Sequence, residues 1–271
     1  MSDEKPASFA VLLEQANARK EHPVARRMLD KVRCRALLVE IGAPVVERFE
    51  LIESIDRLTP SMLRRPTVVK PRRGFNNRGV AALVPLGDGY WREMLSGVVL
   101  DFEGVRGRLA AAALRHTLPD AWIVEDLVEG ESPGVPVDDV KLCMFGEQLA
   151  CSFVRSNGPR GYRWFDADWQ PVDTGVHPAH LEPSIPAPAA RDHLAEIART
   201  ISARLPVPFV RVDFLVGHKQ IVVGELTPYP GWYLDFTPEW DQNLGMLYSR
   251  SDAALRASGR DVTRVDPVVT A

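Results

Sequence analysis

The chain has 271 residues, 45% of them hydrophobic and 25% charged, which is typical of a soluble globular protein with one large domain or two closely packed lobes. A formal net charge of −3 and a pI near 6.1 argue against nucleic-acid binding through bulk positive charge, and the sequence shows neither a signal peptide nor the roughly 20 consecutive apolar residues that span a bilayer. The three cysteines, Cys34, Cys143 and Cys151, lack metal-ligand spacing. Cys143 and Cys151 lie in apolar strand-like runs, so we expect buried free thiols there and a cytoplasmic protein.

In the first half of the chain, helical patterns give way to strand-like ones. Apolar residues at helical spacing predict helices over residues 9–18 and 24–41, the second of them ending at Gly42. Runs rich in β-branched and apolar residues then predict strands. The expected strands cover residues 66–71, 79–86 and 122–127, and a further helix covers residues 109–116.

Two predicted hairpins dominate the second half, the first of them turning at Gly146 and Glu147. Hairpins outnumber βαβ units, so the predicted class is α+β with mostly antiparallel sheets. Neither a G-x-G-x-x-G fingerprint nor a Walker lysine motif is present. The expected segments are the strand pairs 139–145 with 148–155 and 209–216 with 220–226, a meander or loop over 162–173, a proline-stiffened linker over 177–188 and an amphipathic helix over 190–205.

The second predicted hairpin places polar side chains on one of its faces. Residues alternate between the two faces of a strand, so Arg211 and Asp213 share a face. A three-residue loop over 217–219 would pair Val216 with Gln220 and set Arg211 opposite Glu225. In this register, carboxylates from both strands lie on the same face as Arg211.

The polar face of this hairpin has the composition of a magnesium site. Asp213, Glu225 and Thr227 would present two carboxylates and a hydroxyl, the hard oxygen ligands that Mg²⁺ binds together with water and phosphate. Arg211 would offer a forked donor to phosphate or to a developing oxyanion. The alternative is a solvated hairpin face with an Arg–Glu cross-strand pair.

An earlier cluster has the features of a phosphate-binding loop. Lys70 ends a predicted strand, and the loop that follows contains Gly74 and Gly79. Glycines allow backbone N–H groups to close on a phosphate, and the lysine supplies a charge at a fixed place. The alternative is an exposed basic turn, in which three nearby arginines are surface residues rather than ligands of an anionic substrate: Arg72, Arg73 and Arg78.

Two further segments between these clusters are compatible with nucleotide binding. An apolar strand runs into an acidic, glycine-containing link over residues 122–131, which is either a hinge whose backbone reads an adenine edge or a plain strand and turn. Lys141 interrupts an apolar strand, so its ammonium must extend to solvent or find an anion such as phosphate.

The order of these pieces resembles the ATP-grasp superfamily, and most closely its TupA-like branch, which is associated with teichuronopeptide and surface-polysaccharide synthesis. The matches span the chain from about Met28 to Gly245, and they are more specific as an ordered set than singly. They are Asp30–Lys31 with Arg35 and Ile41–Gly42, Val69–Lys70–Pro71, Asp139 to Lys141 with Phe145–Gly146, Val210 to Phe214, and Gly224 to Thr227.

The resemblance implies an ATP-grasp fold, in which two α+β lobes clamp ATP between antiparallel sheets, and it assigns each part of Mg·ATP a place. The phosphates would be held by Lys70 and Lys141 under a mobile lid from Gly74 to Gly79, the adenine by Glu125, Asp126, Leu127 and Val128, the ribose by Glu131, and magnesium by Asp213, Glu225 and Thr227. Arg211 would stabilise the transferring phosphoryl group or the tetrahedral intermediate. Many ATP-grasp ligases have asparagine where this chain has Thr227, but the TupA-like branch often has threonine.

The chain departs from many ATP-grasp ligases at its N-terminus, where no Rossmann-like domain precedes the lysine strand. The implied organisation is a helical N-terminal region over 1–62, an N-lobe with the lid over 63–126, a C-lobe with the magnesium site over 127–259 and a loose tail over 260–271. A homodimer or a partner protein could complete the substrate site. Arg155 and Arg73 are expected to bind the substrate, and aromatic residues over 162–169 and 232–240 either line the acceptor pocket or tuck into the core.

The resemblance implies an ATP-dependent carboxylate–amine ligase. Such an enzyme transfers the γ-phosphoryl group to a small-molecule or peptide carboxylate, and an amine acceptor then attacks the acylphosphate to form an amide or peptide bond, here in natural-product or surface-polymer biosynthesis. Positioned cations stabilise the charge on the phosphoryl oxygens. An ATP-grasp-fold kinase of a small molecule or sugar and a non-catalytic nucleotide-binding protein are the alternatives.

Overall fold

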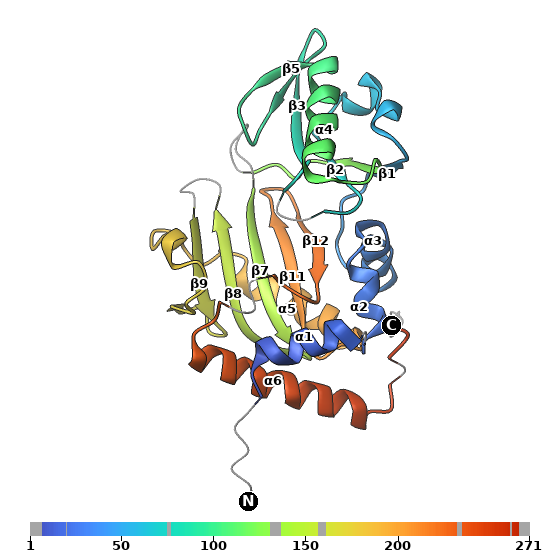
Figure 1. The fold of residues 1–271 in the computed structure, drawn as a ribbon. Coiled ribbons are helices and arrows are strands. Elements are labelled where there is room, and N and C mark those ends of the chain that lie inside the picture. The colour runs from blue at the N-terminus through green and yellow to red at the C-terminus, as the bar shows by residue number, and fades with distance from the viewer. Residues whose placement is uncertain are drawn as a thin grey trace, which may run out of the picture.

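Two six-stranded sheets, one in each of two lobes, form the framework of the protein (Figure 1). The computed structural model describes residues 7–19, 21–74, 77–130, 137–156, 161–231, 235–260 and 262–265. Neighbouring strands pair antiparallel throughout both sheets, which agrees with the expected α+β class. Within the described part of the chain, none of the helices combines the length and the apolar character that crossing a membrane requires.

The first lobe contains the sheet with strand order β1-β6-β2-β3-β4-β5. Helix α4 (Phe102–His116) covers this sheet, and the Asp101 carboxylate caps the helix by accepting a hydrogen bond from Gly104 N at 2.8 Å (Figure 1). The core between sheet and helix includes Trp91, Leu109 and Trp122. The remaining elements are β1 (Phe49–Ile52), η1 (Ile55–Arg57), η2 (Pro60–Leu63), β2 (Thr67–Pro71), β3 (Ala81–Gly87), β4 (Tyr90–Glu93), β5 (Val99–Asp101) and β6 (Trp122–Asp126).

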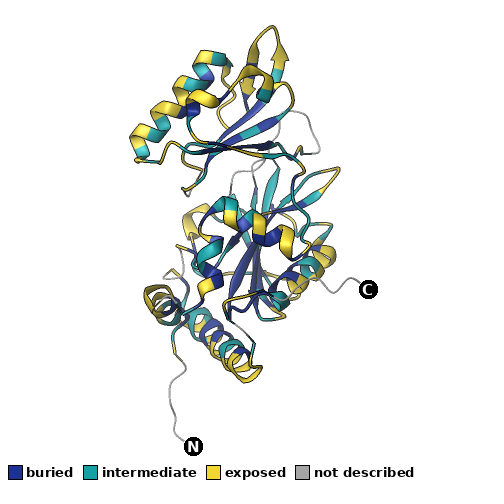
Figure 2. Cartoon of the chain, turned by 90° about the vertical axis from the view of Figure 1, so that its right-hand side faces the viewer, coloured by how far each residue is buried: buried dark blue, intermediate teal, exposed yellow. Residues whose placement is uncertain are grey.

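The second lobe contains the sheet with strand order β10-β9-β8-β7-β11-β12. One face packs on α5, with α2 and α3 at the β12 edge, and the other face packs in part on α1 and α6. Figure 2 shows buried residues concentrated along these strands. The elements are α1 (Phe9–Arg19), α2 (Pro23–Met28), α3 (Lys31–Glu40), β7 (Asp138–Phe145), β8 (Gln148–Ser156), β9 (Gly161–Asp166), β10 (Pro171–Val172), η3 (Pro178–His180), α5 (Arg191–Arg204), β11 (Val210–Val216), β12 (Ile221–Thr227) and α6 (Pro238–Ala257).

The single helix predicted over residues 24–41 is wrong, because the chain forms two helices that meet at Asp30. The Asp30 carboxylate accepts hydrogen bonds from Val32 N at 3.1 Å and Arg33 N at 3.2 Å, which caps α3. The backbone of Asp30 is extended, so the preceding helix cannot continue through it. The end of α3 agrees with the sequence, since Gly42 follows with a positive φ of 72°.

Several elements of the structure were not predicted. β1 lies in the region expected to be helical, yet it pairs with β6, and Ile52 is its one buried residue. β4 and β5 are short, and β5 forms an exposed edge of the sheet. Helix α4 begins at Phe102 rather than at residue 109, and α6 was missed because its buried positions form a narrow stripe. Each missed element has few buried side chains to mark it in the sequence.

Buried side chains of the second lobe decide two points that the sequence left open. Trp164 and Trp169 are 2% and 8% exposed, so these two aromatics of the 162–169 segment tuck into the core. All three cysteines are buried free thiols, as expected for Cys143 and Cys151, which lie directly opposite each other on neighbouring strands.

Helix α6 packs against α1 through a glycine. A Cβ atom on Gly245 would lie 1.9 Å from the backbone oxygen of Ala7 and 3.0 Å from Phe9 N. The crossing chain is backbone, so it cannot rotate away as a side chain would. Gly245 is therefore required for this close approach.

We predict that Gly245→Ala lowers the free energy of unfolding by about 1–3 kcal/mol, because the added methyl group forces α1 away from α6. Urea unfolding followed by circular dichroism measures the change. The matched control is Gly107→Ala in α4, where a Cβ meets nothing within 4 Å and stability should be unchanged or slightly increased. Equal stability of the wild type and the Gly245 variant would contradict the close packing.

The imidazole ring of His22 is buried in the second lobe without a hydrogen bond to replace those it would make with water. The residue is 5% exposed, and neither ring nitrogen has a hydrogen-bond partner among the described residues. Burial lowers the pKa of His22 below its usual value of 6.5, and the carboxylates of Asp252 and Glu21 only partly oppose this. The neutral imidazole is therefore the form that the folded protein holds.

We predict that stability falls as the pH drops below about 6.5, because the unfolded chain then takes up a proton at His22 that the folded chain resists. Unfolding midpoints measured between pH 8 and pH 5 test this. His22→Gln should flatten that part of the profile, whereas His193→Gln, which changes an exposed residue of α5, should not. An unaltered profile in the His22 variant would refute the assignment.

Candidate functional site

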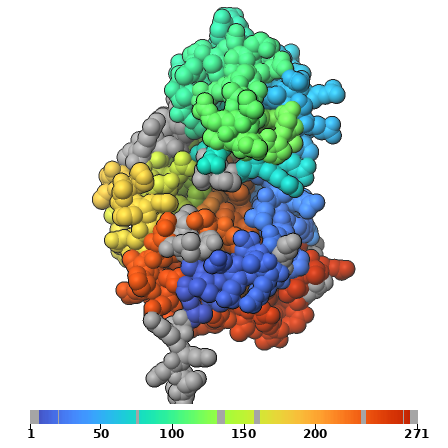
Figure 3. Space-filling model, viewed as in Figure 1, coloured from blue at the N-terminus to red at the C-terminus, as the bar shows by residue number. Residues whose placement is uncertain are grey.

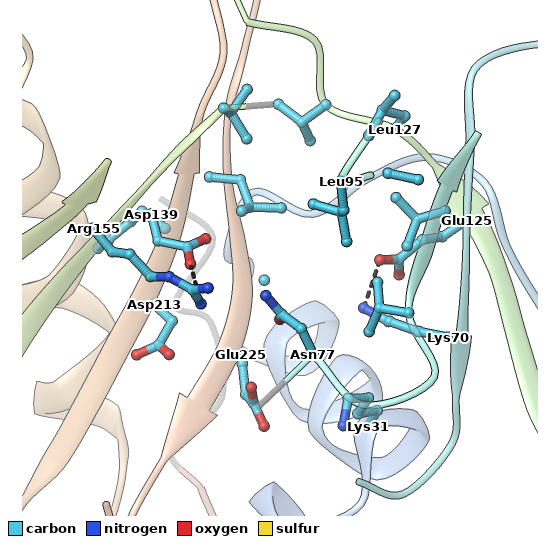
Figure 4. Close-up of a pocket in the computed structure, with 18 of the residues that line it drawn as sticks. Lys31, Lys70, Asn77, Leu95, Glu125, Leu127, Asp139, Arg155, Asp213 and Glu225 are labelled. Atoms are coloured by element: carbon cyan, nitrogen blue, oxygen red, sulfur yellow. Dashed lines mark ion pairs between the residues drawn. The ribbon is translucent and has the colours of Figure 1, made fainter. Parts of the chain in front are cut away.

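A cavity of about 240 Å³ lies between the two lobes and receives residues from both of them. Figure 3 shows the first lobe, in green and cyan, above the second, with the surface hollowed between them. Ten of the residues that the sequence nominated line this cavity (Figure 4). They are Lys70, Gly74, Glu125, Asp126, Leu127, Val128, Lys141, Arg155, Asp213 and Glu225.

Four of the other nominated residues do not line it, and a fifth cannot be placed. Gly79 packs against Pro71 and Leu118, and Arg73 pairs with Asp30 while its side chain is 64% exposed. Arg211 donates hydrogen bonds to both Asp213 and Thr227, but neither Arg211 nor Thr227 is part of the cavity lining. Glu131, the expected ribose partner, lies outside the described residues.

The predicted register of the β11–β12 hairpin is wrong. Val216 pairs with Ile221 rather than with Gln220, and a β-bulge then shifts the register between Asp213 and Phe214. Gly224 is the extra residue on β12, since Phe214 pairs with Val223 and Asp213 with Glu225.

The corrected register brings the predicted metal ligands closer together than the sequence implied. Asp213 faces Glu225 directly, and Arg211 faces Thr227. The expectation that Arg211 lies opposite Glu225 is therefore wrong, whereas the expectation that these side chains share one face is confirmed. Directly opposed side chains have Cβ atoms about 5 Å apart, which is near enough for both carboxylates to reach one cation.

Asp213 is the centre of a buried charge cluster. Its two oxygens accept from Arg211 Nε and Nη2, both at 2.6 Å, and Oδ2 also accepts from Lys141 Nζ at 2.8 Å. Burial alone would raise the pKa of Asp213, but the charges of Arg211 and Lys141 outweigh it and hold this pKa below its usual value. The carboxylate therefore stays ionised at neutral pH.

The first lobe contributes a second ion pair on the opposite wall. Lys70 Nζ lies 2.5 Å from Glu125 Oε1, and both side chains are largely buried. Further along the hinge, the amides of Asp126 and Leu127 already donate to Arg48 O and Pro66 O at 3.4 and 3.1 Å. These two amides are thus occupied by the protein, although both residues line the cavity.

Three of the polar residues that line the cavity were not singled out for a role by the sequence. Lys31 donates to Gly74 O at 2.7 Å, and Asp139 Oδ2 lies 3.8 Å from both Lys141 Nζ and Arg155 Nη1. Asn77, with its amide turned so that the oxygen faces Arg155, accepts from that guanidinium at 3.3 Å. Strand periodicity could have found Asp139, because it shares a face with Lys141. Lys31 and Asn77 reach the cavity only through the tertiary fold.

The two carboxylates at the cavity wall fit Mg²⁺ better than they fit a metal ion whose ligands all come from the protein. No group of three or more His, Cys, Asp or Glu residues suited to a metal ion occurs within the described ranges. Asp213 and Glu225 supply two carboxylates at the cavity wall. Mg²⁺ is usually bound by one or two carboxylates together with water and substrate phosphates.

The TupA-like ATPgrasp family model matches residues 111–249. Among solved structures, D-alanine–D-alanine ligase from Bacillus anthracis superposes with a TM-score of 0.55 and 15% identity, covering 92% of this chain and 77% of that one. The same enzyme complexed with ATP gives a TM-score of 0.53 and 15% identity, with 92% and 76% covered. No curated protein sequence matches this chain. At this identity the structural likeness shows a shared fold.

We predict that Asp213→Asn lowers the free energy of unfolding by on the order of 3 kcal/mol, because it leaves Arg211 and Lys141 buried without their common anion. Urea unfolding without nucleotide measures the effect. The control is Glu40→Gln, which breaks the more exposed Arg27–Glu40 pair and should cost about 1 kcal/mol or less. Similar values for both variants would contradict a buried cluster.

Proposed function

Because the chain belongs to the TupA-like ATP-grasp family, we propose that it is an ATP-dependent carboxylate–amine ligase that forms an amide or peptide bond. The fold is that of ATP-grasp enzymes, as the sequence implied. The observation that carries the proposal is the cavity between the lobes, where two lysines and a facing carboxylate pair lie together: Lys70, Lys141, Asp213 and Glu225.

The cavity offers separate places for the parts of Mg·ATP. Its apolar and hinge residues, Leu127 and Val128 among them, suit the adenine ring, and Lys70 and Lys141 suit the phosphates. Asp213 and Glu225 would hold magnesium, which when bound neutralises charge on the phosphate oxygens. Thr227 and Glu131 remain predicted partners of the metal and the ribose.

The chemistry requires two balanced steps. A carboxylate oxygen of the substrate attacks the γ-phosphorus, the bond to the β–γ bridging oxygen breaks, and ADP leaves. The amine nitrogen then attacks the carbonyl carbon, phosphate leaves with the C–O bond pair, and the nitrogen loses a proton. Lys70 and Lys141 would orient the phosphates during the first step.

Arg211 and Arg155 would have different roles in this reaction. Arg211 holds Asp213 by two hydrogen bonds and so keeps this carboxylate ionised and in place, which supports a positioning role beside the predicted catalytic one. Arg155 lines the cavity next to Asn77 of the lid segment, where a substrate carboxylate could bind. Closure of the lobes would keep water from the acylphosphate. We keep a homodimer or partner protein as a proposed source of further acceptor contacts.

We predict that ADP release requires both an acid and an amine, and that hydroxylamine traps the activated acid as a hydroxamate. A screen of amino acids, peptides and uronic acids with amine acceptors would identify the pair. ADP release with a hydroxyl acceptor and no hydroxamate would instead show a kinase.

In the same assay, Asp213→Asn and Glu225→Gln should each lower turnover by about 100-fold or more, because each removes charge from the metal site. Chelation of Mg²⁺ should have the same effect on the wild type. Glu40→Gln, which breaks the Arg27–Glu40 pair between α2 and α3, is the control that should keep wild-type turnover. Substantial turnover in both variants, with the fold verified by circular dichroism, would refute the metal assignment.

A further inference from the structure

The face of the second lobe's sheet that borders the cavity continues past it towards β9. Arg155 of β8 lines the cavity, and Tyr162 of β9 lies directly opposite Arg155 in the register of these two strands. Directly opposed residues of antiparallel strands point to the same face, with Cβ atoms about 5 Å apart. Arg155 lies on the side of the cavity away from Lys70 and Glu125 (Figure 4). Tyr162 is therefore the next side chain along this face, just beyond the cavity wall.

Tyr162 belongs to a group of three rings, which we call the aromatic edge: Phe153, Tyr162 and His177. The ring centroid of Tyr162 lies 6.0 Å from that of Phe153 and 5.7 Å from that of His177. Phe153 is buried in the apolar cluster that includes residues of α1 and α6, so it gives Tyr162 a fixed support. Tyr162 is half-buried and His177 is exposed, so part of the aromatic edge faces solvent beside the cavity.

The backbone at His177 places its ring against Tyr162. The φ and ψ angles of His177 are both 51°, in the left-handed region that residues other than glycine seldom adopt. His177 precedes the short helix η3, yet its side chain makes no capping hydrogen bond to that helix. The imidazole contacts the Tyr162 ring instead. An uncommon backbone conformation that serves no cap is consistent with a binding role for the side chain.

Arg155 has donors available for a ligand. A guanidinium carries five N–H donors. In the described part of the chain, the Arg155 guanidinium contacts the Asn77 amide oxygen at 3.3 Å and the Asp139 carboxylate at 3.8 Å, and the second distance is too long for a hydrogen bond. Asp139 also lies 3.8 Å from Lys141 Nζ, so it divides its charge between two cations. The remaining donors of Arg155 have the forked geometry that matches a carboxylate.

The charges at this side of the cavity favour an acid over an amine. The cationic side chains of Arg155 and Lys141 attract a carboxylate and repel an ammonium group. Mg·ATP is expected over β7 and β11, at Lys141 and Asp213, whereas Tyr162 lies on β9, on the other side of Arg155. An acid that binds Arg155 by its carboxylate would therefore extend its other end towards Tyr162 and not into the place of the nucleotide.

We propose that Arg155, Tyr162 and His177 form the subsite for the acid substrate, and that this acid carries an aromatic ring joined to its carboxylate through about two carbon atoms, the length that spans opposed side chains. This rests on the proposed function, because it names the acid that the ligase would activate. The carboxylate would bind Arg155, and the ring would pack on the aromatic edge in an offset or edge-to-face arrangement. A sugar acid fits less well, because its hydroxyl groups need several hydrogen-bond partners and the aromatic edge offers mainly ring surface.

The test compares binding of phenylpropionate and propionate by isothermal titration calorimetry with Mg·AMP-PNP present, because the two acids share the carboxylate and differ by the ring. The wild type should bind phenylpropionate about tenfold more tightly, a difference of about 1.4 kcal/mol. Tyr162→Ala should raise the Kd for phenylpropionate about tenfold and change the Kd for propionate less than about twofold. Tyr162→Phe keeps the ring and should keep the wild-type values. Tyr90→Ala is the matched control, because Tyr90 is an exposed residue of β4 that does not line the cavity.

His177→Ala gives a second test that leaves the core intact, because His177 is exposed. It should raise the Kd for phenylpropionate about threefold and leave that for propionate unchanged. His180→Ala, which changes another exposed residue of the same turn, is its control. Unaltered binding of phenylpropionate in both Tyr162→Ala and His177→Ala would overturn the proposal, as would an equal loss for both acids in either variant.

Two further measurements separate the substrate class and the reaction. A wild type that bound glucuronate more tightly than phenylpropionate would refute the aromatic acid. Trapping with hydroxylamine then distinguishes the subsite from the proposed function. Selective binding of phenylpropionate with no hydroxamate formed would overturn the ligase and support the subsite, whereas equal kcat/KM values for hydroxamate formation from phenylpropionate and propionate would overturn the subsite and leave the ligase standing.

Discussion

The ionised carboxylate of Asp213 is the constraint on which the arrangement of the second lobe's cavity wall depends. It lies on β11, between β7 and β12, and binds Lys141 from one neighbouring strand while its own strand supplies Arg211. A buried charge of this kind is tolerated only with its partners in place. The same carboxylate thus fixes the directions of two cations and faces Glu225.

The cost of this cluster is offset by the apolar packing around it. On the same face of the sheet, Phe145, Phe209 and Phe153 belong to an apolar cluster that includes residues of α1 and α6. The opposite face is mostly apolar and packs on α5, and on α2 and α3 near the β12 edge. The charged residues therefore lie on the part of this face that α1 and α6 do not cover and that borders the cavity. The rest of the sheet buries apolar side chains, and this burial stabilises the lobe.

The sequence predicted much of the fold because four strands of the second lobe are apolar or alternating runs that short turns join into two hairpins. It failed where tertiary contacts decide the outcome. The bulge at Gly224 moves Glu225 opposite Asp213, and no local pattern distinguishes that glycine from one in a turn. Asp30 breaks a helix that its apolar neighbours would continue. For the same reason, the lysines on strands were found from the sequence, whereas Lys31 required the position of α3.

The lone pairs of Asp213 limit how a metal could be held. A carboxylate has about four acceptor positions, and Arg211 and Lys141 use three of those on Asp213, two of them at Oδ2. Asp213 can therefore offer a cation one further position, at Oδ1. Glu225, opposite it, makes no ion pair with Lys or Arg within 4.0 Å in the part of the chain described. If the proposed magnesium ion binds here, Glu225 would thus be the stronger ligand of the pair, and most of the shell of the ion would be left to water and phosphate oxygens. Such a site would have little affinity for the metal alone and would bind it together with the nucleotide.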